Sequence, residues 1–169
     1  MISLGEININ MSKEKKKKIC FISSSGGHLE QIKQLKGLTD KYDHFYVVPK
    51  TKSTVKMEQK KYLVSEFSRK NKLVAIFKLG ILTLKEFFIF IKERPSIIIT
   101  TGAGVAVPMC FFGHLFKKKV IYIESFAKIK TPNKTGKIIY DKGWYDLFVV
   151  QWESLLEVYP KATYWGWIY

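Results

Sequence analysis

The sequence predicts a doubly wound α/β domain built on a parallel β-sheet, and three observations carry this prediction. Short apolar runs rich in β-branched and aromatic residues recur along the chain. Segments with apolar residues at helical spacing alternate with these runs. The runs are continuous rather than interrupted by polar residues, which is typical of parallel strands that helices cover on both faces.

In the first half of the chain, the run 19–23 ends in Ser-Ser-Gly-Gly and predicts the first strand. Residues 28–38 carry apolar side chains at helical spacing and predict the first helix. A proline follows the second predicted strand, 44–48, and a weaker third strand is predicted at 62–65. The longest helical pattern covers 73–92.

In the second half, an Arg-Pro pair separates that helix from the next strand. The apolar runs predict strands at 96–100, 120–123, 147–150 and 162–165. The helical patterns predict an apolar helix at 107–116, with a proline in its first turn, and a short helix at 153–158.

Length and composition suit one domain. The chain has 169 residues, of which 47% are hydrophobic, so it can bury a sizeable core. Residues 1–18 read as a flexible basic leader, and residues 19–169 as a single domain. The two cysteines, Cys20 and Cys110, are too few for a disulfide framework and read as buried reduced thiols.

The net charge of +15 has three common explanations, which are binding to nucleic acid, to an anionic membrane surface or to a phosphate-bearing substrate. Of the 29 basic residues, 27 are lysine and two are arginine. Base readout and bidentate phosphate binding favour arginine, whereas a diffuse positive field against lipid works well with lysine. The balance therefore favours the membrane over nucleic acid.

Two glycine-containing loops follow predicted strands, where the ligands of doubly wound sheets bind. The first lacks the Gly-Lys-Ser/Thr of a P-loop and the third glycine of a dinucleotide site. Either loop alone is explained by a tight turn or close packing, but two at one sheet edge would cradle a diphosphate. The candidate diphosphate-binding residues are Ser24, Ser25, Gly26 and Gly27 in the first loop, and Thr101, Gly102, Ala103 and Gly104 in the second.

Two residues beside these loops are candidate catalytic groups. His28 titrates near neutrality, as a general base for an alcohol should. Glu124 ends a strand at the same edge and would serve as base, as a partner orienting His28 or as an acceptor for a sugar hydroxyl. Ordinary loop residues remain the alternative for both. Since His28, His44 and His114 lack metal-ligand spacing, no metal site is expected.

The helix 73–92 is apolar around most of its circumference, with one basic stripe at Lys78, Lys85 and Lys92. A lysine cluster precedes it, which is typical of helices that lie on an anionic membrane without crossing it. A core helix with solvated lysines and a protein-binding helix are the alternatives. The candidate membrane-associating residues are Phe77, Lys78, Leu82, Lys85 and Phe88. No apolar stretch is long enough to span a bilayer.

Four segments resemble a known family. They are Ser24-Ser-Gly-Gly-His-Leu-Glu30, Thr101-Gly-Ala-Gly-Val-Ala-Val-Pro108, Ile121-Tyr-Ile-Glu-Ser-Phe126 and Phe148-Val-Val-Gln-Trp-Glu153. In this order they resemble the bacterial PssD- or CpsF-like capsule and exopolysaccharide proteins, called galactosyltransferase enhancers. The same family contains the membrane-anchoring subunit of the eukaryotic two-subunit UDP-GlcNAc transferase. The predicted fold is also similar to the N-terminal, Rossmann-like half of MurG, a GT-B glycosyltransferase.

The resemblance implies a divided enzyme, with this chain as the acceptor-binding half. A separate small protein with the fold of the GT-B C-terminal half would bind the UDP-sugar, and no cofactor is implied. The acceptor would be a saccharide on undecaprenyl diphosphate, held by the two glycine loops. His28 or Glu124 would activate its hydroxyl. The chain ends at about the point where a one-chain enzyme would cross to its second domain.

The function that the resemblance implies is an inverting sugar transfer of the β-1,4-galactosyltransferase type in capsule or exopolysaccharide synthesis. UDP-galactose is the expected donor, and UDP-glucose, UDP-glucuronate and UDP-GlcNAc are the alternatives. The chain would be cytoplasmic and peripherally associated with the inner face of the plasma membrane. One alternative is a non-catalytic scaffold that recruits and activates its catalytic partner at the membrane. The other is a basic Rossmann-like domain that binds nucleic acid, although no reader element is present.

Overall fold

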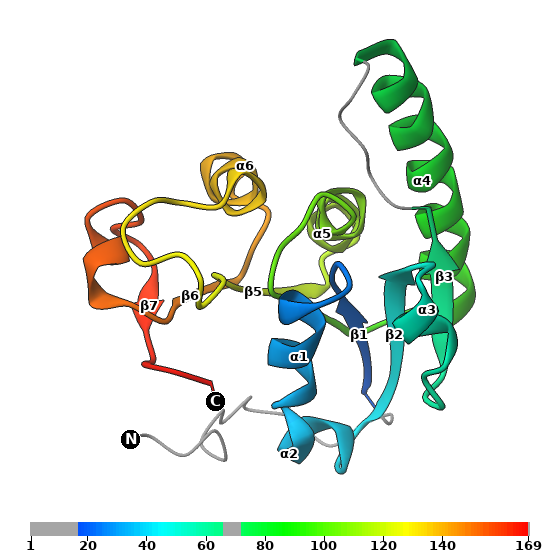
Figure 1. Ribbon diagram of the computed structural model, residues 1–169, viewed down its shortest axis with the longest axis horizontal. Helices are drawn as coiled ribbons and strands as arrows, with labels where there is room; N and C mark the ends of the chain where they lie inside the picture. The colour runs from blue at the N-terminus through cyan, green and yellow to red at the C-terminus, as the bar shows by residue number, and fades with distance from the viewer. Residues whose placement is uncertain (1–16, 66–71, 169) are drawn as a thin grey trace.

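The computed structural model describes residues 17–65 and 72–168 and contains a seven-stranded sheet in the order β3-β2-β1-β4-β5-β6-β7 (Figure 1). Every neighbouring pair of strands is parallel. The predicted doubly wound α/β fold is therefore confirmed. The strands are β1 (Lys18–Ile22), β2 (Asp43–Pro49), β3 (Lys61–Val64), β4 (Ile97–Thr100), β5 (Lys119–Ile123), β6 (Leu147–Val150) and β7 (Thr163–Tyr164).

Helices connect the strands and cover both faces of the sheet. They are α1 (Gly27–Lys33), α2 (Lys36–Thr39), α3 (Lys52–Val55), α4 (Lys72–Glu93), α5 (Ala106–Leu115), α6 (Lys134–Lys142) and the 3₁₀ helix η2 (Glu153–Leu156). The helix predicted at 28–38 is broken, because Leu35 leaves helical geometry between α1 and α2. The sequence reading missed the short α3 and all of α6.

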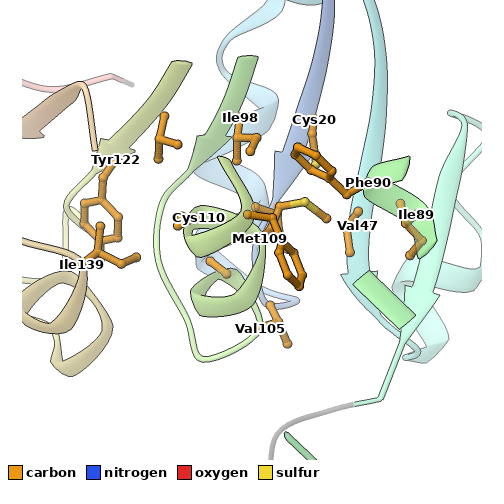
Figure 2. Packing of buried hydrophobic residues seen from close by; sticks show 14 of the residues in the cluster. Cys20, Val47, Ile89, Phe90, Ile98, Val105, Met109, Cys110, Tyr122 and Ile139 are labelled. Carbon is orange, nitrogen blue, oxygen red and sulfur yellow. The ribbon is translucent and has the colours of Figure 1, made fainter. Parts of the chain in front are cut away.

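The core has two layers because successive strand residues point to opposite faces of the sheet. Cys20 and Ile22 belong to the layer that the strands form with α4, α5 and α6, and Ile19 and Phe21 belong to the layer formed with α1. Figure 2 shows the first layer, where Met109 of α5 lies among side chains from β1, β2 and α4. Both cysteines are buried free thiols, as predicted. Burial on both faces explains why the strands read as continuous apolar runs.

The strand order reverses between β1 and β4, because the chain leaves β3 through α4 and returns to the other side of β1. At such a switch point the loops after the two central strands diverge to opposite faces and leave room for a ligand. The loops after β1 and β4 are the two glycine loops. The fold therefore places both candidate loops at the carboxyl edge of the sheet.

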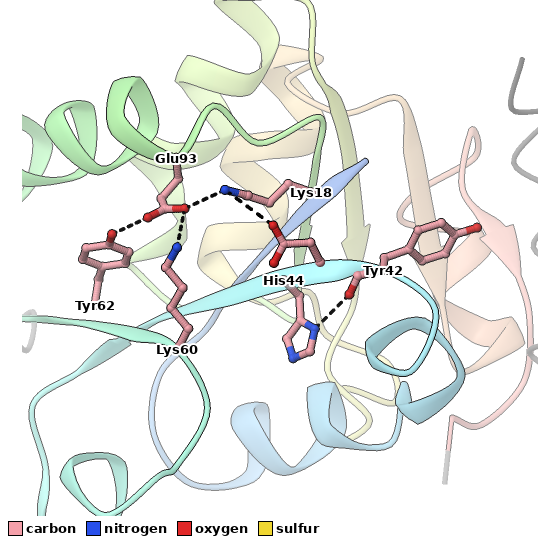
Figure 3. Close-up of polar contacts among 7 residues, drawn as sticks. Lys18, Tyr42, His44, Lys60, Tyr62 and Glu93 are labelled. Atoms are coloured by element: carbon pink, nitrogen blue, oxygen red, sulfur yellow. Dashed lines mark hydrogen bonds and ion pairs between the residues drawn. The ribbon is translucent and has the colours of Figure 1, made fainter. Parts of the chain in front are cut away.

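The opposite edge is closed by an ion-pair network around Glu93, the last residue of α4 (Figure 3). Lys18 and Lys60 donate to one carboxylate oxygen at 3.0 and 2.9 Å, and the Tyr62 hydroxyl donates to the other. Burial alone would raise the pKa of Glu93, but these three hydrogen bonds outweigh it and lower the pKa to about 2. The network ties α4 to β1 and β3.

We expect Glu93→Gln to lower the free energy of unfolding at pH 7 by about 2 kcal/mol, because a charge-assisted network becomes a neutral one. The folded pKa of Glu93 lies below its ordinary value, so its stabilisation is complete above about pH 5 and is lost as the pH falls towards 2. Urea unfolding at a series of pH values measures this. The variant should lose the acid-dependent part of the profile, and an unchanged profile would contradict the assignment.

The predicted leader, residues 1–18, falls almost entirely outside the described residues. Lys18 is an exception, since it begins β1 and contributes to the Glu93 network. None of the helices in the described ranges has the length and apolarity needed to cross a bilayer.

Candidate functional site

The two glycine loops are joined at His28, the second residue of α1. Its ring nitrogen Nδ1 lies 2.7 Å from the backbone carbonyl oxygen of Thr101, in the loop after β4. In return, the Thr101 hydroxyl donates to the backbone carbonyl of His28 at 2.8 Å. This reciprocal pair spans 73 residues of sequence and holds the two loops together at the switch point.

The same contact defines the tautomer of the neutral His28 ring. A carbonyl oxygen only accepts hydrogen bonds, so Nδ1 carries the hydrogen and Nε2 keeps its lone pair. Burial lowers the pKa of His28; the Thr101 carbonyl opposes this shift, and the charge of Lys128 adds to it. A neutral, half-buried imidazole with a fixed tautomer is the form that a general base for a hydroxyl group requires.

The two loops differ in how open they are. Gly26 and Gly27 are exposed, and a Cβ atom at either position would meet nothing within 4 Å. Gly102 is buried, and a Cβ there would lie 2.7 Å from the Tyr122 hydroxyl oxygen. Its amide is also used internally, because it donates to the hydroxyl of Thr100. The first loop therefore offers backbone to a ligand, whereas the glycine at Gly102 serves close packing.

The remaining predicted loop residues are partly accessible. Ser24 and Ser25 are half-buried beside Gly26, and Ala103 and Gly104 are half-buried between β4 and α5. Ala103 has a φ of 84°, an unfavourable conformation for a residue with a Cβ atom. This turn directs the chain from β4 into α5 and places Ala103 and Gly104 on the accessible side of the second loop.

Glu124 differs from the expectation that it contacts a substrate. Its side chain is 0% exposed, and Oε1 accepts the backbone N–H of Ser125 at 2.8 Å. Oε2 accepts the Asn133 backbone N–H at 3.3 Å and the Tyr159 hydroxyl at 3.0 Å. Burial raises the pKa of Glu124, and these hydrogen bonds oppose the rise. The carboxylate thus fastens the loop 125–133 and the start of α6 to β5, and it has no accessible oxygen for a sugar hydroxyl.

A network of two buried amide side chains extends from this loop to α1. Gln31 accepts the backbone N–H of Phe126 at 3.2 Å and an N–H of Gln151 at 2.9 Å. Gln151 also donates to the backbone carbonyl of Glu124 and accepts the backbone N–H of Ile168. The helix that carries His28 is therefore held in place by β5, β6 and residues 165–168.

Lys128 is a site residue that the sequence reading missed. The turn in which its N–H donates to the Ser125 carbonyl places it after β5, at the same edge as His28. Its charge lowers the pKa of both His28 and Glu124, so it lies near both. Within residues 17–65 and 72–168, no three His, Cys, Asp or Glu side chains gather as a metal site needs.

Three aromatic side chains form a cluster at the carboxyl edge, because each follows the end of a parallel strand. Phe126 follows β5, Trp152 follows β6 and Trp167 follows β7. Their ring centroids lie 5.2 to 5.4 Å apart. Trp167 is 59% exposed, so the cluster presents an apolar surface to the solvent.

The outer face of α4 carries a broad apolar surface. Phe77 and Phe88 are 71% and 70% exposed, and Lys78 and Lys85 lie exposed beside them. Leu82 is a correction to the predicted set, since it is 3% exposed and belongs to the core face of α4. In Figure 1 the N-terminal half of α4 extends beyond the end of β3. The other exposed large apolar residues of α4, of α5 and of the position just after α5 are Val74, Ile76, Ile81, Leu84, Ile91, Phe111, Leu115 and Phe116.

Comparison with known proteins identifies a family. A family model described as "Oligosaccharide biosynthesis protein Alg14 like" matches residues 19–168. The chain is 27% identical over 179 residues to "UDP-N-acetylglucosamine transferase subunit ALG14" of Mus musculus, covering 88% of this chain and 82% of that protein. The protein of the same name from Homo sapiens is 38% identical over 81 residues, 44% of this chain and 37% of that protein.

Solved structures share the fold. MurG from Acinetobacter baumannii superposes with a TM-score of 0.64 at 14% identity, covering 80% of this chain and 41% of that chain. UDP-N-acetylglucosamine 2-epimerase from Rickettsia bellii gives a TM-score of 0.68 at 12% identity, covering 91% and 46%. The chain thus spans less than half the length of these two proteins, and the likeness concerns the fold alone.

Proposed function

Since this chain belongs to the Alg14-like family of oligosaccharide biosynthesis proteins, we propose that it is the acceptor-binding, membrane-associating subunit of a two-subunit inverting glycosyltransferase. The observation that carries the proposal is the neutral His28, with Nε2 free, held between two loops at the switch point of the sheet. The names of the relatives, which are subunits of a UDP-N-acetylglucosamine transferase, support a glycosyl transfer.

In the proposed reaction, Nε2 of His28 takes the proton from a hydroxyl of the acceptor sugar. The hydroxyl oxygen attacks the anomeric carbon of the donor while the bond from that carbon to the UDP oxygen breaks. UDP leaves from the opposite face, so the configuration inverts. The Thr101 carbonyl stabilises the imidazolium that forms, because it accepts from Nδ1–H.

We propose that Glu124 positions the loop 125–133 and does not transfer a proton. Its carboxylate oxygens already accept hydrogen bonds from the backbone of this loop and from the Tyr159 hydroxyl. That loop carries Lys128, whose ammonium group is a candidate contact for the diphosphate of a lipid-linked acceptor. The open backbone at Gly26 and Gly27 is the second candidate contact.

A separate UDP-sugar-binding protein is the partner that we propose, and we place it over Trp167 and its two aromatic neighbours. Large aromatic side chains at an apolar surface are typical anchors of protein interfaces. The resemblance to capsule proteins favours UDP-galactose as donor, whereas the names of the relatives favour UDP-N-acetylglucosamine. The acceptor that we propose is a saccharide on a polyprenyl diphosphate such as undecaprenyl diphosphate.

The test is reconstitution of the chain with the proposed UDP-sugar-binding partner protein. The purified pair is given a polyprenyl-diphosphate-linked sugar together with UDP-galactose or UDP-N-acetylglucosamine, and the elongated lipid is detected by mass spectrometry. Transfer by the pair, and by neither protein alone, is expected, and the donor used identifies the sugar. Full activity from the partner alone would overturn the proposal in favour of a scaffold.

We also propose that the outer face of α4 binds the inner surface of the plasma membrane. We expect Phe77→Ser combined with Phe88→Ser to weaken binding to vesicles containing anionic lipid by more than about tenfold, since two exposed aromatic side chains no longer enter the interface. Flotation of the protein with phosphatidylglycerol vesicles measures this.

The matched control for this membrane test is Ile138→Ser combined with Tyr164→Ser, which removes two exposed side chains from α6 and β7, at the far end of the sheet from α4. It should bind vesicles like the unmodified protein. Equal loss in both double variants would mean that general hydrophobicity, and not α4, sets the binding. Melting temperatures of both variants confirm that the fold is kept.

A further inference from the structure

A cavity of about 660 Å³ lies at the carboxyl end of β2, away from the two glycine loops. Its described lining consists of Lys50, Thr51, Lys52, Val55 and Lys56. Three of these five residues carry a positive charge and none carries a negative one. The surface itself is mostly apolar, formed by Val55 and the carbon atoms of its neighbours, and the positive charges of the three lysines surround it.

The backbone that forms this cavity is firmly held. Thr51 and Thr54 form a reciprocal capping box at α3, and the Thr54 hydroxyl donates to the Pro49 carbonyl at 2.6 Å. Thr54 is fully buried, and the Lys50 N–H continues the sheet ladder by donating to Val64. Because these bonds fix the loop, the backbone that carries the three lysines is already ordered before a ligand binds.

The lysines of the cavity are not neutralised by the described protein. In residues 17–65 and 72–168, no carboxylate lies within 4.0 Å of the ammonium group of Lys50, Lys52 or Lys56. By contrast, Lys18 and Lys60 at the opposite edge both pair with Glu93. The hydroxyl of Thr51 already serves the capping box, so the charges available to a ligand at this cavity are those of the three lysines.

The cavity and the apolar face of α4 lie at the same end of the sheet. The cavity follows β2, β2 pairs with β3, and α4 packs beside β3. In Figure 1, α3, β3 and α4 lie at the same end of the sheet, and α4 extends past the carboxyl end of β3. A surface that contacts the protruding part of α4 would therefore face the carboxyl edge, where the three lysines are.

From this placement we infer that the cavity binds the phosphate head group of an anionic membrane lipid, at a site separate from the catalytic loops. Three ammonium groups more than balance the single negative charge of a lipid phosphodiester, and Val55 contacts the glycerol backbone or the first methylene groups of the lipid. The inference rests on the proposed membrane association for its choice of ligand, but not on His28 or on transfer activity.

The experiment uses soluble lipid monomers, so that it depends neither on α4 insertion nor on the partner. Dihexanoyl-phosphatidylglycerol below its micelle concentration is titrated into ¹⁵N-labelled protein, and amide shifts of residues 50–56 are followed by NMR. Saturable shifts confined to these amides are expected. We expect K50Q/K52Q/K56Q to weaken the binding by about tenfold or more, because each lysine near an anionic lipid contributes measurably.

The control variant is K36Q/K41Q/K142Q, which removes the same charge from three exposed lysines elsewhere and should keep the affinity. Equal weakening in both triple variants would overturn the site in favour of net charge. Inorganic phosphate is the second probe, and equal affinity for it would overturn the lipid assignment. Absent shifts at residues 50–56 would overturn the site itself, even if vesicle flotation and sugar transfer succeed.

Discussion

We expect His28→Asn to lower kcat of the reconstituted pair by about 10²- to 10⁴-fold, which is the range for loss of a general base. Asparagine is the informative replacement because its side-chain N–H can still donate to the Thr101 carbonyl, whereas Nε2 is lost. A residue that only joins the two loops would tolerate this change. His28→Ala removes both Nε2 and the donor to the Thr101 carbonyl. Its melting temperature should show whether the contact between the two loops also stabilises the fold.

The pH dependence of kcat/KM tests independently whether His28 is the general base. Since burial lowers the pKa of His28 from its ordinary value of 6.5, the acid limb of kcat/KM should have its midpoint below pH 6.5. Activity rises with pH through that midpoint, because the neutral imidazole is the active form. His28→Asn should lose this limb. An acid limb that survives unchanged in the variant would assign the base to another group.

The second prediction is that Glu86 destabilises the folded protein, so that replacing it increases the free energy of unfolding. Its side chain is 0% exposed on the core face of α4, and neither carboxylate oxygen has a hydrogen-bond partner among the described residues. Burial raises its pKa well above 4.5, and the nearby backbone N–H of Met109, which forms no regular hydrogen bond with the carboxylate, offsets only part of this rise. We expect Glu86→Leu to increase the free energy of unfolding at pH 7 by about 2 kcal/mol, or the melting temperature by about 5 °C.

The sign of the pH effect at Glu86 is opposite to that at Glu93. The folded protein holds the Glu86 proton more tightly than the unfolded chain, so unfolding releases a proton above pH 4.5. The unmodified protein therefore loses stability as the pH rises through and beyond that value. Glu86→Gln keeps the shape of the side chain and should remove this slope in urea titrations. If Glu86→Leu were less stable than the unmodified protein at pH 7, Glu86 would have a stabilising partner in the folded protein, and the prediction would be wrong.

The sequence predicted the strands well because burial on both sheet faces leaves a strong local signal. It missed α6, whose composition includes a glycine, a threonine and three lysines, and whose apolar residues are few. The available signals were at its ends, where Asn133 caps the first turn and Gly143 adopts a left-handed conformation. Gly136 within α6 contributes packing, since a Cβ there would lie 2.5 Å from Glu124.

The candidate site could be predicted in part. His28 follows from a histidine beside a glycine loop at a strand end, and strand order makes Thr101 its neighbour. The burial of Glu124 depends on α6 and on Tyr159, which lie later in the sequence. The local sequence around Glu124 therefore does not indicate that its side chain is buried. Leu82 was misplaced because α4 is apolar on nearly every side, and only the contact with α5 and the sheet distinguishes its two faces.

The chain of hydrogen bonds from Gln31 through Gln151 to Ile168 has a consequence for how the molecule opens. Detaching residues 165–168 from β6 would remove the donor to the buried Oε1 of Gln151, and an unpaired buried acceptor is costly. Fraying of this segment is thus coupled to loosening of α1, where the chain began its first helix. In hydrogen exchange the Ile168 amide should behave as part of the innermost cooperative unit, with protection close to that of the central strands.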